Sequence, residues 1–176
     1  MMILTTFILL VGLLSCGIAF YFTQNAVLFT ITITVGTCFY HFAMRLIVGH
    51  GIDAIFHNKM NYNRWWFRER KFEAKFYNFL QVKKWKKHLP TYNADYYDMT
   101  KHSVEEIIQA TCQAEVVHEV IMVLSFIPVI FTAWFGSLIA FLITSSLAFC
   151  VDSVFVILQR FNRPRLRRLL KRQTVI

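Results

Sequence analysis

The stretch MILTTFILLVGLLSCGIAFYFTQNAVLFTITITVGTCFYHFAM, residues 2–44, contains no charged side chain. Roughly 20 consecutive apolar residues are enough to cross the hydrocarbon core of a bilayer. Two runs of this kind fit here, from Met2 to Phe22 and from Ala26 to Val48. Because the polar linker Thr23-Gln24-Asn25 between them is short, we expect a transmembrane helical hairpin.

A second uncharged stretch runs from Val120 to Val151. It supports a third span over Val116–Phe135 and a fourth over Gly136–Leu158, with a turn near Gly136. Pro128 is expected to kink the third helix without ending it. An alternative in which parts of these two runs form one re-entrant element remains open.

Charge in this chain is segregated. The sequence is 56% hydrophobic, yet it has 19 Lys and Arg against 10 Asp and Glu. Apart from Arg45, all basic residues lie between Lys59 and Lys101 or between Arg160 and Arg172. Soluble proteins distribute charge over their surface, so this segregation argues against a soluble protein. An even number of spans places both basic segments on the cytoplasmic side, as the positive-inside rule requires.

These patterns predict an all-α integral membrane protein with four transmembrane helices and a cytoplasmic amphipathic helical segment. We expect a multi-pass protein of the cell membrane, with N- and C-termini in the cytoplasm. The expected segments are an N-terminal hairpin (1–50), an interfacial segment (51–113), a C-terminal hairpin (114–159) and a basic tail (160–176).

The middle segment is rich in aromatic and basic residues. Phe72, Phe76, Phe79 and Leu80 recur at helical spacing, and six lysines between Lys71 and Lys87 are interleaved with them. Such a helix, ended by Pro90, is expected to lie in the membrane interface with its ammonium groups toward lipid phosphates. The lysines either anchor the membrane or hold an anionic donor, such as a phosphopantetheine carrier. Flanking spans argue against nucleic acid as a partner.

A helix is expected to start after Ser103. Ser103 with Glu106 three residues later is a capping-box pattern, so the helix should lead from there into the third span.

Several ionisable residues lie within or beside spans, where they are costly. Glu115 and His118 are three residues apart and therefore share a helix face, and Asp152 and Gln159 lie in the fourth span. A neutral histidine can accept a hydroxyl proton, and amide or guanidinium donors can stabilise an oxyanion. The same residues could instead form a hydrogen-bonded network between helices. His41 and Arg45 of the second span could join either arrangement.

A metal site is not expected. The Glu-x-x-His pattern of di-iron bundles occurs twice in those proteins and once here.

Three stretches together resemble a known family, the glycosyl-4,4'-diaponeurosporenoate acyltransferases of bacterial carotenoid biosynthesis. They are the segment from Phe72-Glu73 through VKKWK (82–86) to Leu89-Pro90, the segment TCQAEVVH (111–118), and QRFNRPRL (159–166). The likeness covers roughly residues 70–172.

The resemblance implies a small membrane enzyme that esterifies a hydroxyl of a membrane-embedded glycolipid with a fatty acyl group. Acyl-CoA or an acyl carrier protein would be the donor, with no bound cofactor, and membrane lipids and a lipid-like acceptor would be partners. The implied site residues are Glu115, His118, Gln159, Asn162, Arg163 and Arg165, with Trp85 and Lys86 at the interface. We take His118, aided by Glu115, as the catalytic base, and assign Asp152 and the remaining residues to substrate binding. Arg163, Arg165 and Asn162 would bind the donor phosphate or the oxyanion.

The sequence also departs from the family pattern. Ala110 stands in place of Glu, Gln113 in place of Arg, and Asp152 in place of Asn. Two other functions therefore remain open. One is a non-catalytic lipid-binding or assembly protein with the same fold, and the other is a different lipid-modifying transferase. The sequence specifies neither the acceptor nor the oligomeric state.

Overall fold

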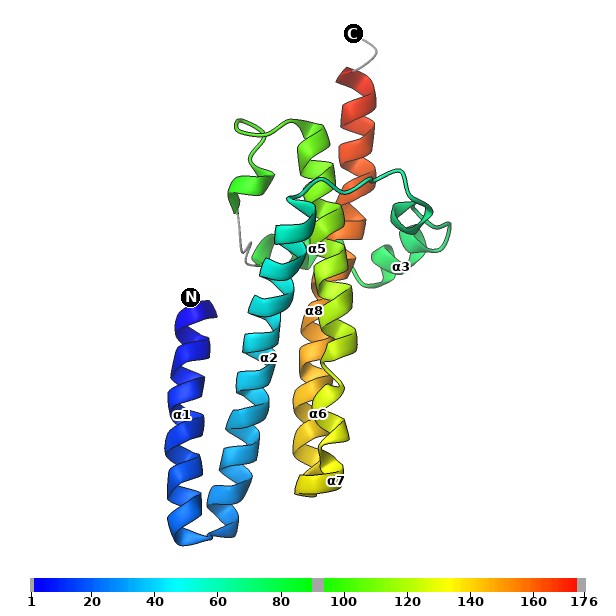
Figure 1. Ribbon diagram of the computed structural model, residues 1–176. Helices are drawn as coiled ribbons and strands as arrows, with labels where there is room; N and C mark the ends of the chain where they lie inside the picture. Colours follow the sequence, from blue (N-terminus) through cyan, green and yellow to red (C-terminus); the bar gives the residue numbers. More distant parts are fainter. Residues whose placement is uncertain (1, 90–93, 174–176) are drawn as a thin grey trace. The chain divides into compact units, whose positions relative to one another are not determined.

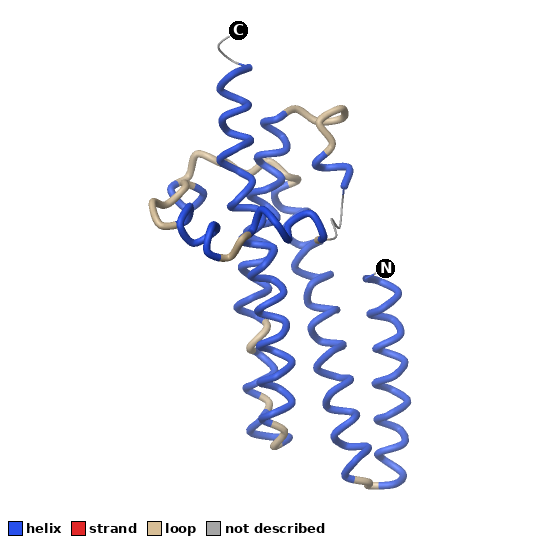
Figure 2. The backbone as a smooth tube through the Cα atoms, turned by 180° about the vertical axis from the view of Figure 1, so that it is seen from behind, coloured by secondary structure: helices blue, strands red, loops and turns tan. Residues whose placement is uncertain are grey.

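Helices form almost all of the chain. The computed structural model describes residues 2–89 and 94–173, and within them every regular element is a helix (Figure 2). Four helical stretches are long and apolar enough to cross a membrane, which confirms the predicted fold class. They are α1 (Met2–Thr23), α2 (Ala26–Phe56), the stretch Val104–Phe135, and α8 (Leu138–Gln173).

The chain divides into two compact units, each assembled from segments distant in sequence. The first unit comprises Met1–Gly51 and Glu119–Asp152, and the second comprises Ile52–His118 and Ser153–Ile176. This division follows packing and does not test the four segments expected from charge.

The first unit contains an antiparallel hairpin of α1 and α2 (Figure 1). Gln24 adopts a left-handed conformation in the turn, and the Asn25 side chain accepts a hydrogen bond of 2.8 Å from the Val27 amide, which caps α2. The two helices approach closely at Gly36, where an added Cβ would lie 3.2 Å from Leu13. Small residues at helix contacts are typical of membrane bundles.

The third span is interrupted near Pro128. Helix α5 (Val104–Leu124) ends before it, and α6 (Ile127–Ile130) begins with the proline in its first turn, where the missing N–H costs no hydrogen bond. The stretch Val104–Phe135 still forms one candidate span, so the irregularity at Pro128 does not end it. The Tyr40 hydroxyl donates to the Leu124 carbonyl (2.9 Å), which satisfies a backbone acceptor at the end of α5.

The predicted turn at Gly136 is present. Helix α7 (Thr132–Phe135) ends there with Gly136 at φ 67°, a left-handed conformation that favours glycine.

The second unit contains a series of short helices in place of the single amphipathic helix predicted. They are η1 (Trp65–Phe67), α3 (Glu73–Phe79), α4 (Val82–Trp85), η2 (Lys86–His88) and η3 (Ala94–Tyr97). Gln81, at φ 51°, separates α3 from α4. The rings of Phe72, Phe76 and Phe79 are exposed, as expected of an interfacial face. Pro90, the predicted stop, lies outside the described residues.

The predicted capping box is confirmed at the start of α5. The Glu106 carboxylate accepts a hydrogen bond from the Ser103 amide (2.8 Å), and the Ser103 hydroxyl accepts one from the Glu106 amide (3.2 Å). Helix α8 continues without a break from the fourth span into the basic tail as far as Gln173, with Pro164 inside it.

Candidate functional site

The candidate site in the second unit is built on one face of α8 and one face of α5. Arg160, Arg163 and Arg167 follow one another at three and four residues on α8, so they share a face of that helix. On α5, Thr111 and Glu115 are four residues apart and share a face in the same way.

Glu115 is the centre of the site. Its side chain is 0% exposed, and both carboxylate oxygens contact guanidinium groups of α8. Arg160 donates to Oε1 at 2.6 Å, and Arg163 forms an ion pair with Oε2. A carboxylate in this position has no access to water, so its charge depends on the two arginines.

Arg160 links Glu115 to a second carboxylate. Its Nη2 and Nε donate to Glu73 Oε1 at 2.7 and 3.1 Å, a forked arrangement that fits the planar guanidinium. The Tyr77 hydroxyl donates to the other oxygen of Glu73 at 3.0 Å. Burial, followed by the charge of Glu73, raises the pKa of Tyr77, so this phenol remains a hydrogen-bond donor.

Arg163 is held by its own set of contacts. Its side chain is 3% exposed and donates to the Thr111 hydroxyl (3.2 Å) and the Thr111 carbonyl (3.1 Å). The guanidinium also lies 5.0 Å from the centroid of the Phe67 ring. These contacts join α8 to α5 and hold the guanidinium in place.

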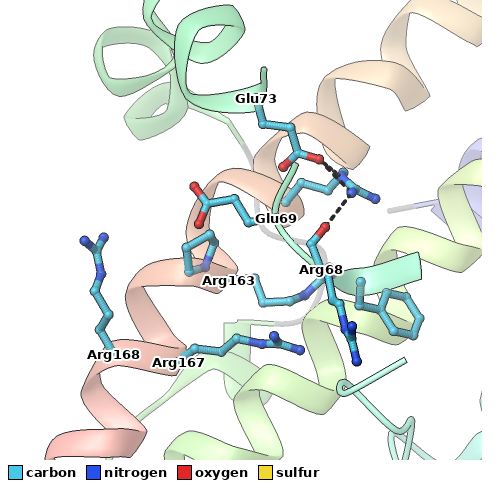
Figure 3. A pocket seen from close by; sticks show the side chains of 9 residues that line it. Arg68, Glu69, Glu73, Arg163, Arg167 and Arg168 are labelled. Carbon is cyan, nitrogen blue, oxygen red and sulfur yellow. Dashed lines mark hydrogen bonds and ion pairs between the residues drawn. The ribbon is translucent and has the colours of Figure 1, made fainter. Parts of the chain in front are cut away.

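A pocket of about 200 Å³ adjoins this network (Figure 3). Arg163, Arg167 and Arg168 of α8 form one wall, and Glu73 of α3 approaches from the other side with Arg68 and Glu69 of the preceding loop (Figure 3). The backbone carbonyl of Arg68 accepts a hydrogen bond from Arg160 (3.3 Å), which fixes the loop to the network.

His118 lies one helical turn after Glu115. Its imidazole is partly buried and stacks on the Phe155 ring, with centroids 4.8 Å apart and planes at 12°. Stacking fixes the plane of the ring, which is useful for a group that must accept a proton in one direction.

Two other predicted residues lie together. Lys86 donates to the side-chain oxygen of Asn162 at 3.0 Å and also lies 4.8 Å from the centroid of the Phe161 ring. Burial, followed by the charges of Arg165, Lys83 and Lys87, lowers the pKa of Lys86.

The remaining predicted residues of the second unit have separate positions. Trp85 donates from its indole to the Leu80 carbonyl at 2.8 Å, a local contact that closes the turn at Gln81. Gln159 is buried and hydrogen-bonds the Tyr97 hydroxyl. Burial raises the pKa of Tyr97 to about 12, although the Gln159 bond and the Arg163 charge oppose the shift.

Asp152 belongs to the first unit. It is 1% exposed and forms an ion pair with Arg45 of α2, which also donates to the His41 carbonyl at 3.0 Å. His41 is itself buried.

Gln113 makes contacts that an arginine could not reproduce. Its amide nitrogen donates to Asp53 at 2.9 Å, while its oxygen accepts from the Asn58 backbone amide at 2.7 Å. A guanidinium has no acceptor, so an arginine could not accept the bond from the Asn58 amide. Ala110 is also buried.

No group of three or more His, Cys, Asp or Glu side chains lies close enough to hold a metal ion in residues 2–89 and 94–173.

The model of the glycosyl-4,4'-diaponeurosporenoate acyltransferase family matches residues 63–172. This range is well over half of the chain and includes every residue of the network around Glu115. The chain belongs to this family. It is therefore an acyltransferase related to carotenoid biosynthesis, as the resemblance implied. Searches of curated proteins and of solved structures found no match.

Sequence reasoning did not identify Glu73 as a member of the site, and it grouped Arg160 with the polar residues that follow the fourth span without assigning it a role. A signal for Glu73 was present, because Glu69 and Glu73 are the only acidic residues between Lys59 and Leu89. Within the family motif QRFNRPRL, the arginine at position 160 contacts two carboxylates, which makes it as central as Arg163.

Proposed function

We propose that this acyltransferase moves a fatty acyl group from a thioester donor to a hydroxyl of a membrane-embedded glycolipid or related lipid at the cytoplasmic leaflet. The observation that carries the proposal is the family match over 63–172, which coincides with the ionic network of the second unit. The cytoplasmic location is supported by the segregation of basic residues and the four candidate spans.

In this proposal His118 is the general base. Its neutral imidazole removes the proton of the acceptor hydroxyl while the oxygen attacks the thioester carbonyl carbon. The new C–O bond forms and the C–S bond breaks, and the imidazolium returns its proton to the thiolate that leaves. The stacked Phe155 ring supports this role because it holds the imidazole plane.

Glu115 is assigned a positioning role. Both of its oxygens contact arginines, so it is better suited to fix α5 against α8 than to act on the reacting atoms. Gln159, Asn162 and Arg165 stay as proposed substrate-binding residues.

The proposal is tested with the full-length protein in lipid nanodiscs. The assay supplies a labelled long-chain acyl-CoA and a glycosylated carotenoid acceptor, and measures acylated lipid by mass spectrometry. Loss of one positioned general base typically lowers the rate by roughly 10²–10⁴-fold, so His118→Ala should fall by about that factor. Size-exclusion elution and helical content should match those of the parent protein.

His50→Ala provides the matched control, because His50 is exposed and lies outside residues 63–172. It should keep parental activity. Unchanged turnover in His118→Ala would show that His118 is not the general base. Lipid that copurifies without acyl transfer would favour the non-catalytic alternative, and transfer from S-adenosylmethionine would favour the other lipid-modifying reaction.

A further inference from the structure

A second pocket in the second unit differs from the first in its charge balance. Its volume is about 340 Å³, and it lies between the α3–η2 segment and α8. Its walls include five basic side chains and one acidic side chain, Glu69. The basic ones are Lys83, Lys86, Lys87, Arg165 and Arg168.

In the first pocket, by contrast, the buried arginines already have counter-charges. Arg160 contacts both Glu73 and Glu115, and Arg163 contacts Glu115. No acidic residue of the described ranges forms an ion pair with Lys83, Lys87 or Arg165. The second pocket therefore has five basic side chains against one acidic side chain, whereas the first has five against two.

Lys86 is the fixed member of this set. The bond to Asn162 and the Phe161 ring beneath its ammonium group hold it in place, and two of its three N–H donors remain for a ligand. Burial and the neighbouring cations lower its pKa, so binding of an anion there would relieve repulsion.

The pocket walls also include aromatic rings beside the charges. Tyr77 and Phe161 both contribute, with ring centroids 5.6 Å apart. A ligand that fits has a compact, strongly anionic group attached to a less polar arm.

We propose that this second pocket binds the phosphate of the acyl donor, at the phosphopantetheine arm that carries the thioester. The assignment rests on the proposed acyl transfer and adds the site of donor recognition to it. A cluster of five cations suits a phosphate better than a single carboxylate, because the diphosphate of acyl-CoA carries two charges and both it and the phosphodiester of an acyl carrier arm offer several oxygens for charge-assisted hydrogen bonds.

The test compares ligands that differ by one phosphate. Binding of 4'-phosphopantetheine and of pantetheine to the full-length protein in phosphatidylcholine nanodiscs is measured by calorimetry. One charge-assisted contact corresponds to roughly a tenfold change in affinity. 4'-Phosphopantetheine should therefore bind at least about tenfold more tightly than pantetheine. Lys86→Met and Arg165→Met should each weaken the binding of 4'-phosphopantetheine, relative to that of pantetheine, by about tenfold.

Lys75→Met is the matched control, since Lys75 is exposed on α3 and does not line the pocket. Its affinity should equal that of the parent. Arg165 is exposed at the pocket edge, so Arg165→Met remains informative if Lys86→Met affects folding. Equal binding of the two ligands would overturn the proposal.

Nanodiscs that contain phosphatidylglycerol distinguish a donor phosphate from a lipid headgroup. If 4'-phosphopantetheine still binds in these nanodiscs, the result supports a site for the donor phosphate. If the anionic lipid displaces the ligand completely, the proposal is overturned. Phosphate-dependent binding without acyl product would refute only the proposed function. Acyl transfer with unchanged KM for acyl-CoA in both variants would refute only the pocket assignment.

Discussion

The two units of this chain bury ionic groups in different ways. The first unit holds the ion pair of Arg45 with Asp152, between two apolar helices. The second unit holds a network in which Arg160 bridges two carboxylates and Glu115 contacts two arginines. A single pair is the minimum needed to neutralise a charge within an apolar helix, whereas a network also fixes the orientation of each group.

The difference matches the extent of the family. Every residue of the network lies within 63–172, but Arg45 lies outside it. We infer that the network serves the shared reaction, while the Arg45–Asp152 pair serves the stability of this chain. Variants of these residues and their neighbours can break or sharpen this contrast.

The largest effect is expected from Glu115→Ala. It leaves Arg163 buried without a counter-charge, and removal of one partner from a buried pair costs about 3–5 kcal/mol. Stability in detergent, measured by thermal unfolding, should fall accordingly, and acyl transfer should be lost. The control is Glu105→Ala, because Glu105 is exposed and accepts a hydrogen bond from the Tyr62 hydroxyl at 3.2 Å.

Neutralising both members of one ion pair of the network should not restore activity. Glu115→Gln combined with Arg163→Met removes both charges, yet it deletes the contacts of Arg163 to Thr111. Folding should recover in part and activity should not. Full activity in the double variant would show that the network has no positioning role.

A smaller effect is expected from Asp152→Leu in the first unit. It leaves Arg45 unpaired in a candidate span, at a cost of roughly 2.5–3.5 kcal/mol on insertion scales. The double variant Arg45→Met with Asp152→Leu should restore both stability and acyl transfer, because apolar replacements of a buried pair are often neutral or stabilising. Activity that stays low in the stable double variant would give Asp152 a role in substrate binding.

The exposed pair of Asp95 and Lys101 gives the reference for this experiment. Both side chains are more than half exposed, at 71% and 56%. Loss of such a surface pair through Asp95→Ala should change stability by less than about 1 kcal/mol.

The spans and the capping box were predictable because their signals are local. Apolar runs specify the four candidate spans, and Ser103 with Glu106 lie within one helical turn. The partners of buried charges were not predictable in this way. Glu115 and Arg160 are 45 residues apart, and Glu73 and Arg160 are 87 apart, so only tertiary packing brings them together.

The positions at which the helices are interrupted were also not predictable from the sequence. Gln81 takes a left-handed conformation that periodicity of the aromatic residues does not reveal. Pro128 fits the first turn of a helix as well as an internal kink, and its local sequence does not distinguish the two. Gln113 looked like a loss relative to the family pattern, whereas its acceptor oxygen meets a backbone donor, Asn58, that no motif includes.

An effect confined to alkaline pH concerns the edge of the network. Tyr97 is partly buried, and this burial raises its pKa from 10.0 to about 12. Above the unfolded pKa the unfolded chain loses this proton while the folded chain keeps it. The stability contributed by burial of Tyr97 is therefore complete below pH 10 and falls as the pH rises toward 12. Tyr97→Phe removes the titration. Between about pH 9.5, just below the unfolded pKa, and about pH 11.5, just below the folded pKa, the variant should therefore lose less stability than the parent. Thermal unfolding of both proteins across this range measures the difference. Phe also deletes the bond to Gln159, which lowers stability equally at every pH, so only the slope is diagnostic. Parallel curves would mean that Tyr97 titrates alike in the folded and unfolded chain, and that the protection of Gln159 and Arg163 from water does not extend to this phenol.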